Sequence, residues 1–208
     1  MIGHADAAFD TLTIVDRLTM PPEGVLEGDV HMVAYLAFLL SIYAGDDPDD
    51  WGYSFVSTRS ASPFSDAIDG ALDALRHVGL VIDRGLSLVS SSHAAAELLL
   101  WRPLPRNARR DPLLRAAADS AAQLSLPTTV HGLSTEPQLK HARQLGGLRK
   151  LPDDLTLPRL REHFASVDNV LGSGLVARDA PELDEDLLVR AVLWLEYLTD
   201  AQRHEGAA

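Results

Sequence analysis

The chain has 208 residues and 46% of them are apolar, which is enough material for one domain with a buried core or for two smaller ones. It contains no cysteine, and this excludes disulfides, thiolate metal ligands and a cysteine nucleophile. The formal net charge of −12 is uneven, because residues 1–104 hold fifteen acidic and five basic side chains whereas residues 105–208 hold fifteen and thirteen. The acidic first half should repel the phosphate backbone of nucleic acids.

The start of the chain and its apolar runs predict a cytoplasmic protein without a membrane helix. Residues 1–10 carry no Lys or Arg, so they lack the basic start of a secretory signal. The longest nearly uncharged runs, 30–44 and 86–96, are shorter than the about 20 apolar residues that a membrane-spanning helix needs. The absence of cysteine also fits a reducing compartment.

Helices are predicted at three places in the first part of the chain. Apolar residues at helical spacing predict one over 5–18, and the prolines that follow separate it from the rest. A second helix over 29–44, with Asp29 as its N-cap, has little polar surface, so we expect it to be covered on most sides. A third over 62–79 has Ser62 as its cap and Pro63 in its first turn.

Extended segments are predicted around the third helix. Residues 53–58 alternate between apolar and polar side chains, as in a short strand. Residues 80–89 predict a small β-hairpin with its turn at Gly85, and a further helix runs from a cap at Ser92 to about Trp101.

This order of elements is that of a winged-helix domain. The runs Phe55-Val56-Ser57-Thr58, Ser62-Pro63-Phe64-Ser65 and Val78-Gly79-Leu80-Val81 resemble those of the YwgA-like winged-helix proteins. They are also similar to the small middle subunits of bacterial ABC three-component defence systems, which accompany an SMC-like ATPase and an effector. The resemblance covers residues 29–101 and implies a winged-helix fold and a protein partner. It implies no catalytic residues.

The helix predicted over 62–79 is acidic on its polar face. Asp66, Asp69 and Asp73 stand there against Arg76 and His77. A winged helix that reads DNA places this helix in the major groove and presents Arg, Lys, Asn or Gln to the bases. We therefore expect the N-terminal half to dock onto a protein and not onto duplex DNA.

The second half begins with a basic cluster, which consists of Arg102, Arg106, Arg109, Arg110 and Arg115. A helix is predicted over 113–126, and the proline-rich stretch 127–158 is the least regular part, with a short helix over 138–145. The last helix is predicted over 181–203, with Pro181 at its start and several acidic residues in its first turn.

The sequence as a whole predicts a mostly α fold with a small β-hairpin, built as a winged-helix-like core plus a helical C-terminal region. Residues 1–22 form an N-terminal helix and a proline linker in this division. Residues 23–104 form the winged-helix-like domain, and residues 105–208 form the helical C-terminal region.

The sequence fits none of the common motifs of catalytic and metal sites. The eight histidines show no pair at helical ligand spacing, and the acidic loop of Asp47 and Asp49 has Trp51 where a calcium ligand is required. Gly172-Ser173-Gly174 is too short for a nucleophile elbow, and Gly146-Gly147 lacks the lysine of a phosphate-binding loop. We expect no metal, no cofactor and no enzymatic activity, although catalytic residues that converge from distant segments would leave no such motif.

A non-enzymatic accessory subunit that binds a protein partner or a second copy of the chain is the function that these observations favour. Leu193, Trp194 and Tyr197 widen the apolar face of the last helix, so we predict that they contact another subunit. The alternative is that this helix is central in its own domain.

The arginine cluster is the second predicted docking surface. Arg106, Arg109 and Arg110 are expected to meet an acidic protein partner. The alternative function is a winged-helix transcriptional regulator that contacts DNA through its C-terminal half, because this cluster also offers cations to phosphates.

Overall fold

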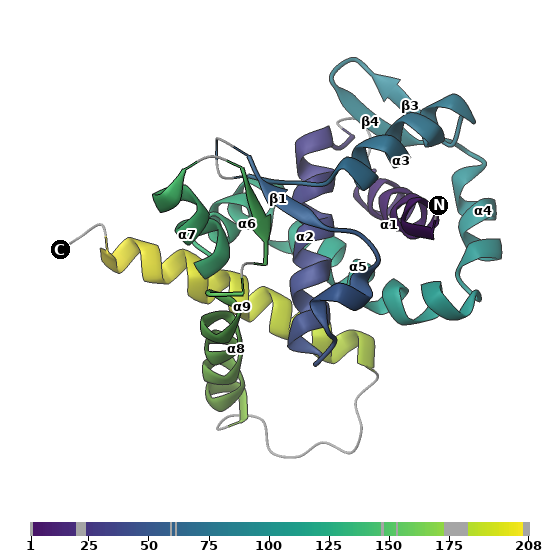
Figure 1. The fold of residues 1–208 in the computed structure, drawn as a ribbon. Helices are drawn as coiled ribbons and strands as arrows, with labels where there is room; N and C mark the ends of the chain where they lie inside the picture. Colours follow the sequence, from purple (N-terminus) through teal and green to yellow (C-terminus); the bar gives the residue numbers. More distant parts are fainter. Residues whose placement is uncertain are drawn as a thin grey trace.

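The computed structural model describes residues 2–19, 24–58, 60, 62–146, 148–152, 154–172 and 183–205. These residues form a mostly helical fold with short antiparallel strands, which confirms the predicted fold class (Figure 1). None of the helices in the described part of the chain is long and apolar enough to cross a membrane.

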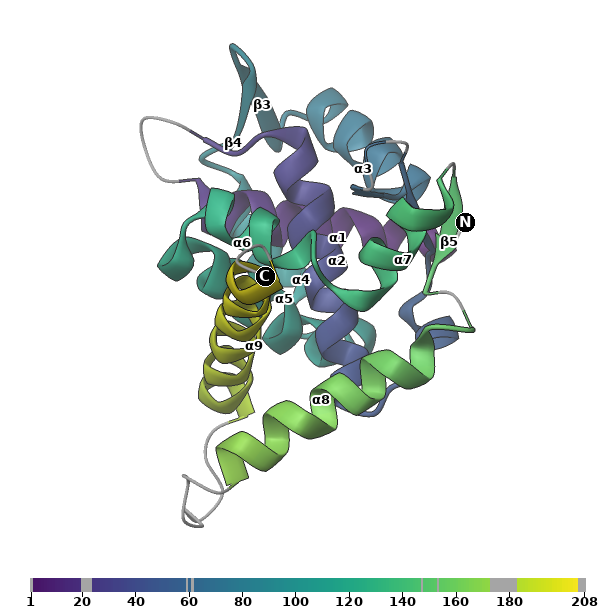
Figure 2. The same ribbon diagram turned by 90° about the vertical axis from the view of Figure 1, so that its left-hand side faces the viewer.

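The central element is α2 (Glu27–Tyr43), whose side chains are buried at every position from Val30 to Ile42. It contacts α1 (Ile2–Leu18), α5 (Pro105–Leu124) and α6 (Leu126–Leu133), and Figures 1 and 2 show it in the middle of the molecule. The prediction of a covered helix is thus confirmed.

The start of α2 differs from the prediction in one detail. Leu26 is the N-cap residue, and the Asp29 carboxylate reaches back from the first turn to accept the Leu26 backbone N–H at 3.3 Å. Asp29 therefore satisfies an orphan donor, but it does so from inside the first turn of the helix, while the Leu26 side chain has no acceptor to return a hydrogen bond.

The next helix, α3 (Asp66–His77), starts later than predicted. Pro63 and Phe64 form strand β2 (Pro63–Phe64), which pairs antiparallel with β1 (Phe55–Ser57), and Ser65 takes the N-cap position in place of Ser62. Strand β2 is an edge strand, where a proline leaves no ladder hydrogen bond unmade. Pairing with β1 thus decides the conformation of Pro63.

The predicted hairpin is present as β3 (Val81–Arg84) and β4 (Ser87–Ser90), joined by a turn in which Gly85 has a φ of +69°. The positive φ explains the need for glycine at this position. Helix α4 (Ala94–Trp101) follows and ends at the predicted residue, although His93 and not Ser92 is its N-cap.

The stretch predicted as least regular contains more structure than expected. Helices α6 and α7 (Pro137–Leu145) occupy half of it, and β5 (Arg149–Leu151) pairs antiparallel with β1, so that Phe55 faces Leu151. The three-stranded sheet β2-β1-β5 joins segments far apart in the sequence. Helix α8 (Leu157–Gly172) follows.

Helix α5 also begins earlier than predicted, at Pro105 instead of 113, and contains Pro112 in its interior. Proline at the first position needs no N–H donor, and packing against α1, α2 and α9 (Leu183–Glu205) holds the helix together across Pro112. The predicted start of the last helix at Pro181 lies outside the described residues.

One hydrophobic core runs through the whole chain. Its buried residues extend from Ala7 to Leu198 and cross both predicted boundaries, at 22 and at 104. Helix α1 packs on α3, α4 and α5, and α5 packs on α9. The three predicted segments therefore share one core.

Candidate functional site

Three arginines of the cluster, Arg106, Arg109 and Arg110, lie on the first half of α5 and face α1 and the segment after α2. Arg110 is buried, and its Nε donates a hydrogen bond to Asp10 Oδ1 at 2.8 Å while its Nη2 pairs with Asp10 Oδ2. Its Nη1 donates to the Trp51 backbone carbonyl at 2.7 Å, and its guanidinium carbon lies 3.8 Å from the centre of the Trp51 ring. Tyr53 donates its hydroxyl hydrogen to Asp10 Oδ2 at 2.6 Å.

Burial and charge act in opposite directions on this pair. Burial raises the pKa of Asp10 above its ordinary value, and the Arg110 guanidinium offsets only part of that rise. For Arg110, burial alone would lower the pKa, but the Asp10 carboxylate outweighs it and the pKa is raised. The two side chains therefore hold each other in place as a desolvated ion pair.

Two further arginines of α5 pair with carboxylates of the first half, but their own side chains are exposed. Arg106 Nη2 lies 3.5 Å from Oδ2 of the buried Asp6, and Arg109 pairs with Asp46. All three arginines line one cleft of about 420 Å³, which we call the arginine cleft.

The carboxylates that face Arg106, Arg109 and Arg110 come from the acidic half of the same chain. Buried Arg110 is closed to any partner, which contradicts its prediction as a docking residue. In the last turn of α1, Arg17 donates from Nε to Asp119 Oδ1 of α5 at 2.8 Å. Ion pairs between the acidic first half and the arginines of α5 thus connect the two halves within one fold.

The predicted docking residues of α9 are divided between core and surface. Trp194 is only 2% exposed and packs edge-on against Phe164 of α8, with ring centres 5.1 Å apart. Tyr197 is 48% exposed, and Leu193 is half-buried. The prediction that Trp194 meets another subunit is wrong, because α8, for which the sequence pattern gave no prediction, covers this side of α9.

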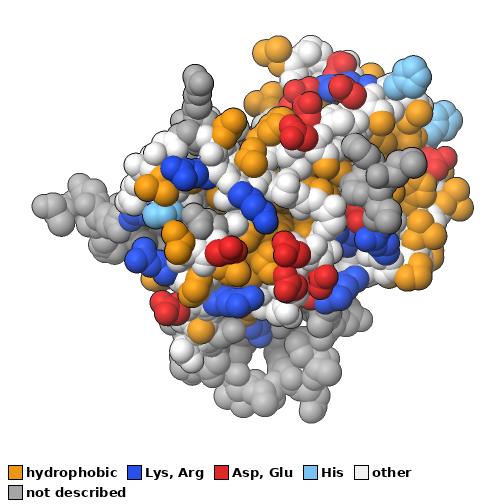
Figure 3. Space-filling model, viewed as in Figure 1, with side chains coloured by type: hydrophobic (Ala, Val, Ile, Leu, Met, Phe, Trp, Pro, Cys, Tyr) orange, Lys and Arg blue, Asp and Glu red, His pale blue; other side chains and the backbone are white. Residues whose placement is uncertain are grey.

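An apolar feature of the described surface lies on α4 and the turn that follows it, and the sequence did not single it out. Leu99, Leu100 and Leu104 are 67%, 69% and 53% exposed. Beside them lies a hollow of about 400 Å³ between α1, α4 and the start of α5, lined by Ala8, Phe9 and Trp101. We call the three leucines and this hollow the α4 surface, and Figure 3 shows apolar side chains gathered over α4 at the right edge of the molecule.

The sequence contains a signal for this surface. Residues 94–101 read Ala-Ala-Ala-Glu-Leu-Leu-Leu-Trp, which is apolar almost all round, yet only Ala94 and Leu98 are buried. A short helix of this composition must be covered on more than one side, and the fold covers one side only.

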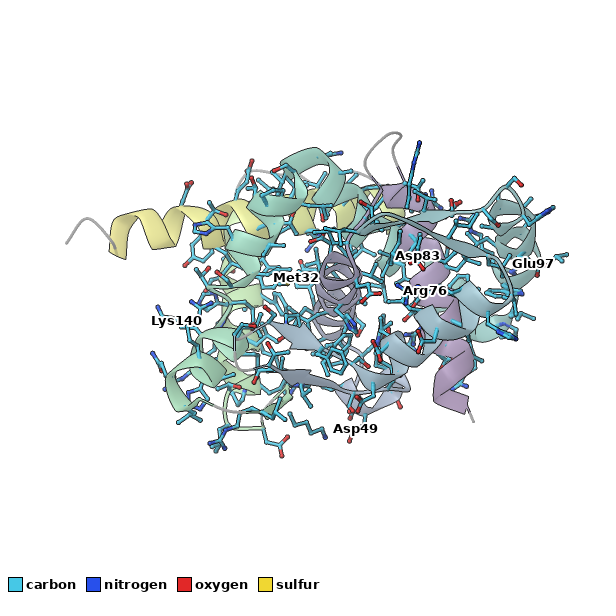
Figure 4. The ribbon with its side chains drawn as sticks, turned by 90° about the horizontal axis from the view of Figure 1, so that it is seen from above. Met32, Asp49, Arg76, Asp83, Glu97 and Lys140 are labelled. Carbon is cyan, nitrogen blue, oxygen red and sulfur yellow. The ribbon has the colours of Figure 1, made fainter. Side chains whose placement is uncertain are left out.

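Helix α3 offers no groove-reading surface. Arg76, the arginine on its polar face, donates from Nε to Asp83 at 3.0 Å and from Nη1 to Asp73 at 3.4 Å, and it also pairs with Glu27 (Figure 4). Asp66, Asp69 and Asp73 are exposed. A helix with neutralised cations and exposed carboxylates repels phosphates.

The chemistry of these features is that of binding. The arginine cleft sets cations against carboxylates, the α4 surface is apolar, and the described residues contain no group of three or more His, Asp or Glu side chains placed to hold a metal ion. No protein-family model matches the chain, and neither a curated protein nor a solved structure is similar enough to it to count as a match.

Proposed function

We propose that this chain is a non-enzymatic accessory subunit that docks onto a protein partner through the α4 surface. The exposure of Leu99, Leu100 and Leu104 beside an apolar hollow is the observation that carries the proposal. Covering apolar surface contributes about 25 cal/mol per Å² removed from water, and a contiguous exposed apolar patch on a folded protein marks an interaction site.

The occupant that fits the α4 surface is an amphipathic helix of another protein. A hollow flanked by leucines takes one large apolar side chain of such a helix, and its neighbours one turn away meet the leucines. Arg106 also lines this hollow, and its guanidinium is exposed although it lies 3.5 Å from Asp6, so a carboxylate beside the apolar stripe of the partner would share this cation with Asp6. A second copy of the chain is disfavoured because two molecules of net charge −12 repel each other.

The resemblance of residues 29–101 to the middle subunits of bacterial three-component defence systems points to the same kind of role. In such a complex the partner is an SMC-like ATPase, and we include this in the proposal. The alternative, a regulator that contacts DNA through its second half, has less support because Arg106, Arg109 and Arg110 already face carboxylates.

The proposal is tested by co-expressing the full chain with each protein that its neighbouring genes encode, followed by calorimetric titration of any pair that co-purifies. The variants Leu99→Asp and Leu100→Asp place a charge in the proposed interface without touching the core. Leu86→Asp is the matched control, because Leu86 is almost fully exposed on the hairpin turn, away from α4.

We expect a complex that the two α4 variants weaken about a hundredfold or more and the hairpin variant leaves unchanged, as for interface residues of hot-spot type. Equal effects of all three variants would refute the role of α4. A wild-type chain that binds none of these proteins would refute it as well. A homodimer that Leu99→Asp dissociates would replace the heterologous partner by a second copy.

A further inference from the structure

A second cleft lies at the other end of the molecule, between α7, α8 and α9. Its volume is about 490 Å³, and it does not share any lining residue with the arginine cleft or with the α4 surface. Figure 4 shows its residue Lys140 on the side of the molecule opposite to Glu97 of α4. We call it the C-terminal cleft.

Cationic side chains outnumber carboxylates in the C-terminal cleft. Lys140 of α7 and Arg159 of α8 line it, and among the described residues Glu162 of α8 is the one carboxylate in its lining. Arg159 is exposed. Lys140 and Arg159 bring positive charge to one place on a protein with a net charge of −12, and positive charge attracts anions.

Two histidines from different helices add directional donors. His141 of α7 and His163 of α8 both line the cleft, and each has one ring nitrogen, His141 Nε2 and His163 Nδ1, that is buried without a hydrogen-bond partner among the described residues. Burial also lowers the pKa of His163, although Glu162 acts against this, so near neutral pH the ring is uncharged and carries one N–H.

The position of that N–H follows from the cost of burying polar groups. A buried N–H without an acceptor is costly. The ring proton is therefore favoured on the nitrogen that is not both buried and without a partner. His163 can therefore donate from Nε2 and His141 from Nδ1, and both residues line the cleft. Tyr197 closes one side, with its ring centre 5.8 Å from that of His163.

From this arrangement we propose that the C-terminal cleft binds the phosphate group of a small phosphorylated molecule. Lys140 and Arg159 supply charge, and His141 and His163 supply N–H donors. A phosphate monoester carries up to two negative charges and three terminal acceptor oxygens, which matches two cations and two further donors better than a carboxylate does. The cleft is larger than a phosphate ion, so it leaves room for the organic part of the molecule.

The test is a calorimetric titration of the full chain with inorganic phosphate and with glycerol 2-phosphate at low ionic strength. Arg159→Ala removes a cation of the cleft, and Arg161→Ala on the same helix is its matched control, because Arg161 is exposed and does not line this cleft. Lys140→Ala and Arg143→Ala form a second such pair on α7. These exposed side chains do not contribute to the core, so each variant should fold.

We expect saturable binding of both probes, with glycerol 2-phosphate the tighter, and a loss of about tenfold in affinity for each cleft variant but not for its control. The imidazole resonances of His141 and His163 should shift on binding, and those of the exposed His93 should not. His163→Phe should weaken binding, and His163→Gln should restore part of it, because the amide N–H replaces the ring donor.

Three outcomes would overturn this proposal: the absence of saturable phosphate binding, equal losses in Arg159→Ala and Arg161→Ala, or a shift confined to other histidines. A phosphoserine peptide that binds far more tightly than glycerol 2-phosphate, with the same loss in Arg159→Ala, would replace the small molecule by a phosphorylated protein. None of these results depends on the α4 surface, so the two proposals stand or fall separately.

Discussion

The Tyr35 hydroxyl of α2 donates a hydrogen bond to Oε2 of Glu136, the N-cap residue of α7, at 3.2 Å inside the core. Glu136 is fully buried and also accepts the backbone N–H groups of Gln138 and Leu139 at 2.8 and 3.0 Å, yet no cation faces it among its hydrogen-bond partners. Burial raises the pKa of Glu136 to about 7, and the three donors offset only part of this effect.

The buried Glu136 makes stability depend on pH. Because its pKa is about 7 in the folded chain and 4.5 without burial, the folded state binds more protons between these values. The contribution of this group to the free energy of unfolding therefore falls as pH rises from about 4.5 to 7, by on the order of 3 kcal/mol, and is constant above.

The measurement is urea unfolding of the wild type and of Glu136→Gln at several pH values. The difference in unfolding free energy between the two should change over this window in favour of the glutamine variant as pH rises. Parallel curves for the two proteins would show that Glu136 does not take up a proton on folding.

Breaking the Asp10–Arg110 ion pair should destabilise the fold strongly. Arg110→Met leaves the Asp10 carboxylate buried without its cation, which costs about 3–5 kcal/mol, whereas replacing both residues by apolar ones removes much of that cost. Chemical unfolding of the single and double variants measures the coupling. Arg106→Met is the control, because the Arg106 guanidinium is exposed and lies 3.5 Å from Asp6, so its removal should cost less than removal of the buried Arg110. If the losses in unfolding free energy from replacing Asp10 and Arg110 were additive in the double variant, the pairing would be contradicted.

Trp194→Ala should lower the free energy of unfolding by about 3–5 kcal/mol, as expected for removing a large ring from a packed core. The partly exposed Tyr197 should tolerate alanine with a loss of about 1 kcal/mol or less. Thermal and urea unfolding compare the two variants. A Trp194→Ala protein that keeps its stability but loses association with another subunit would restore the interface role predicted from the sequence.

Two features require glycine at position 52, the positive φ and the close approach of Asp6, whereas only the positive φ requires it at position 45. Both glycines have a strongly positive φ, but a Cβ on Gly52 would lie 2.6 Å from Asp6 Oδ2, whereas a Cβ on Gly45 would meet nothing within 4 Å. Alanine at either position costs about 1–3 kcal/mol for the backbone conformation, and Gly52→Ala should cost more because it also displaces the carboxylate that faces Arg106. Equal losses in urea unfolding would show that Asp6 moves aside freely.

Duplex DNA should not bind the full chain at physiological salt, since α3 presents carboxylates and its Arg76 is held by Glu27, Asp73 and Asp83. Fluorescence anisotropy with a labelled duplex is the measurement. The full chain is required because the core of residues 23–104 is shared with α1 and α5. Micromolar binding would revive the regulator hypothesis, and loss of that binding in Arg109→Ala would place it on the second half.

The local sequence pattern alone was sufficient to predict elements whose structure does not depend on a particular distant partner. Helix α2 is apolar on all sides, so no partner has to be known to predict that it is buried. The hairpin of β3 and β4 needs only two short extended runs and a glycine at the turn. The net charge and the spacing of the histidines likewise follow directly from the amino-acid sequence.

Tertiary structure decided what each side chain meets. The sequence shows that Trp194 must be covered, but only the position of α8 reveals that the same chain covers it. It shows arginines in one half and carboxylates in the other, but the pairing of Arg110 with Asp10 depends on how α5 docks onto α1. The α4 surface and the C-terminal cleft have the same physical origin. Each is formed by residues that are distant in sequence and are brought together by packing. A local sequence pattern does not show which distant residues will meet.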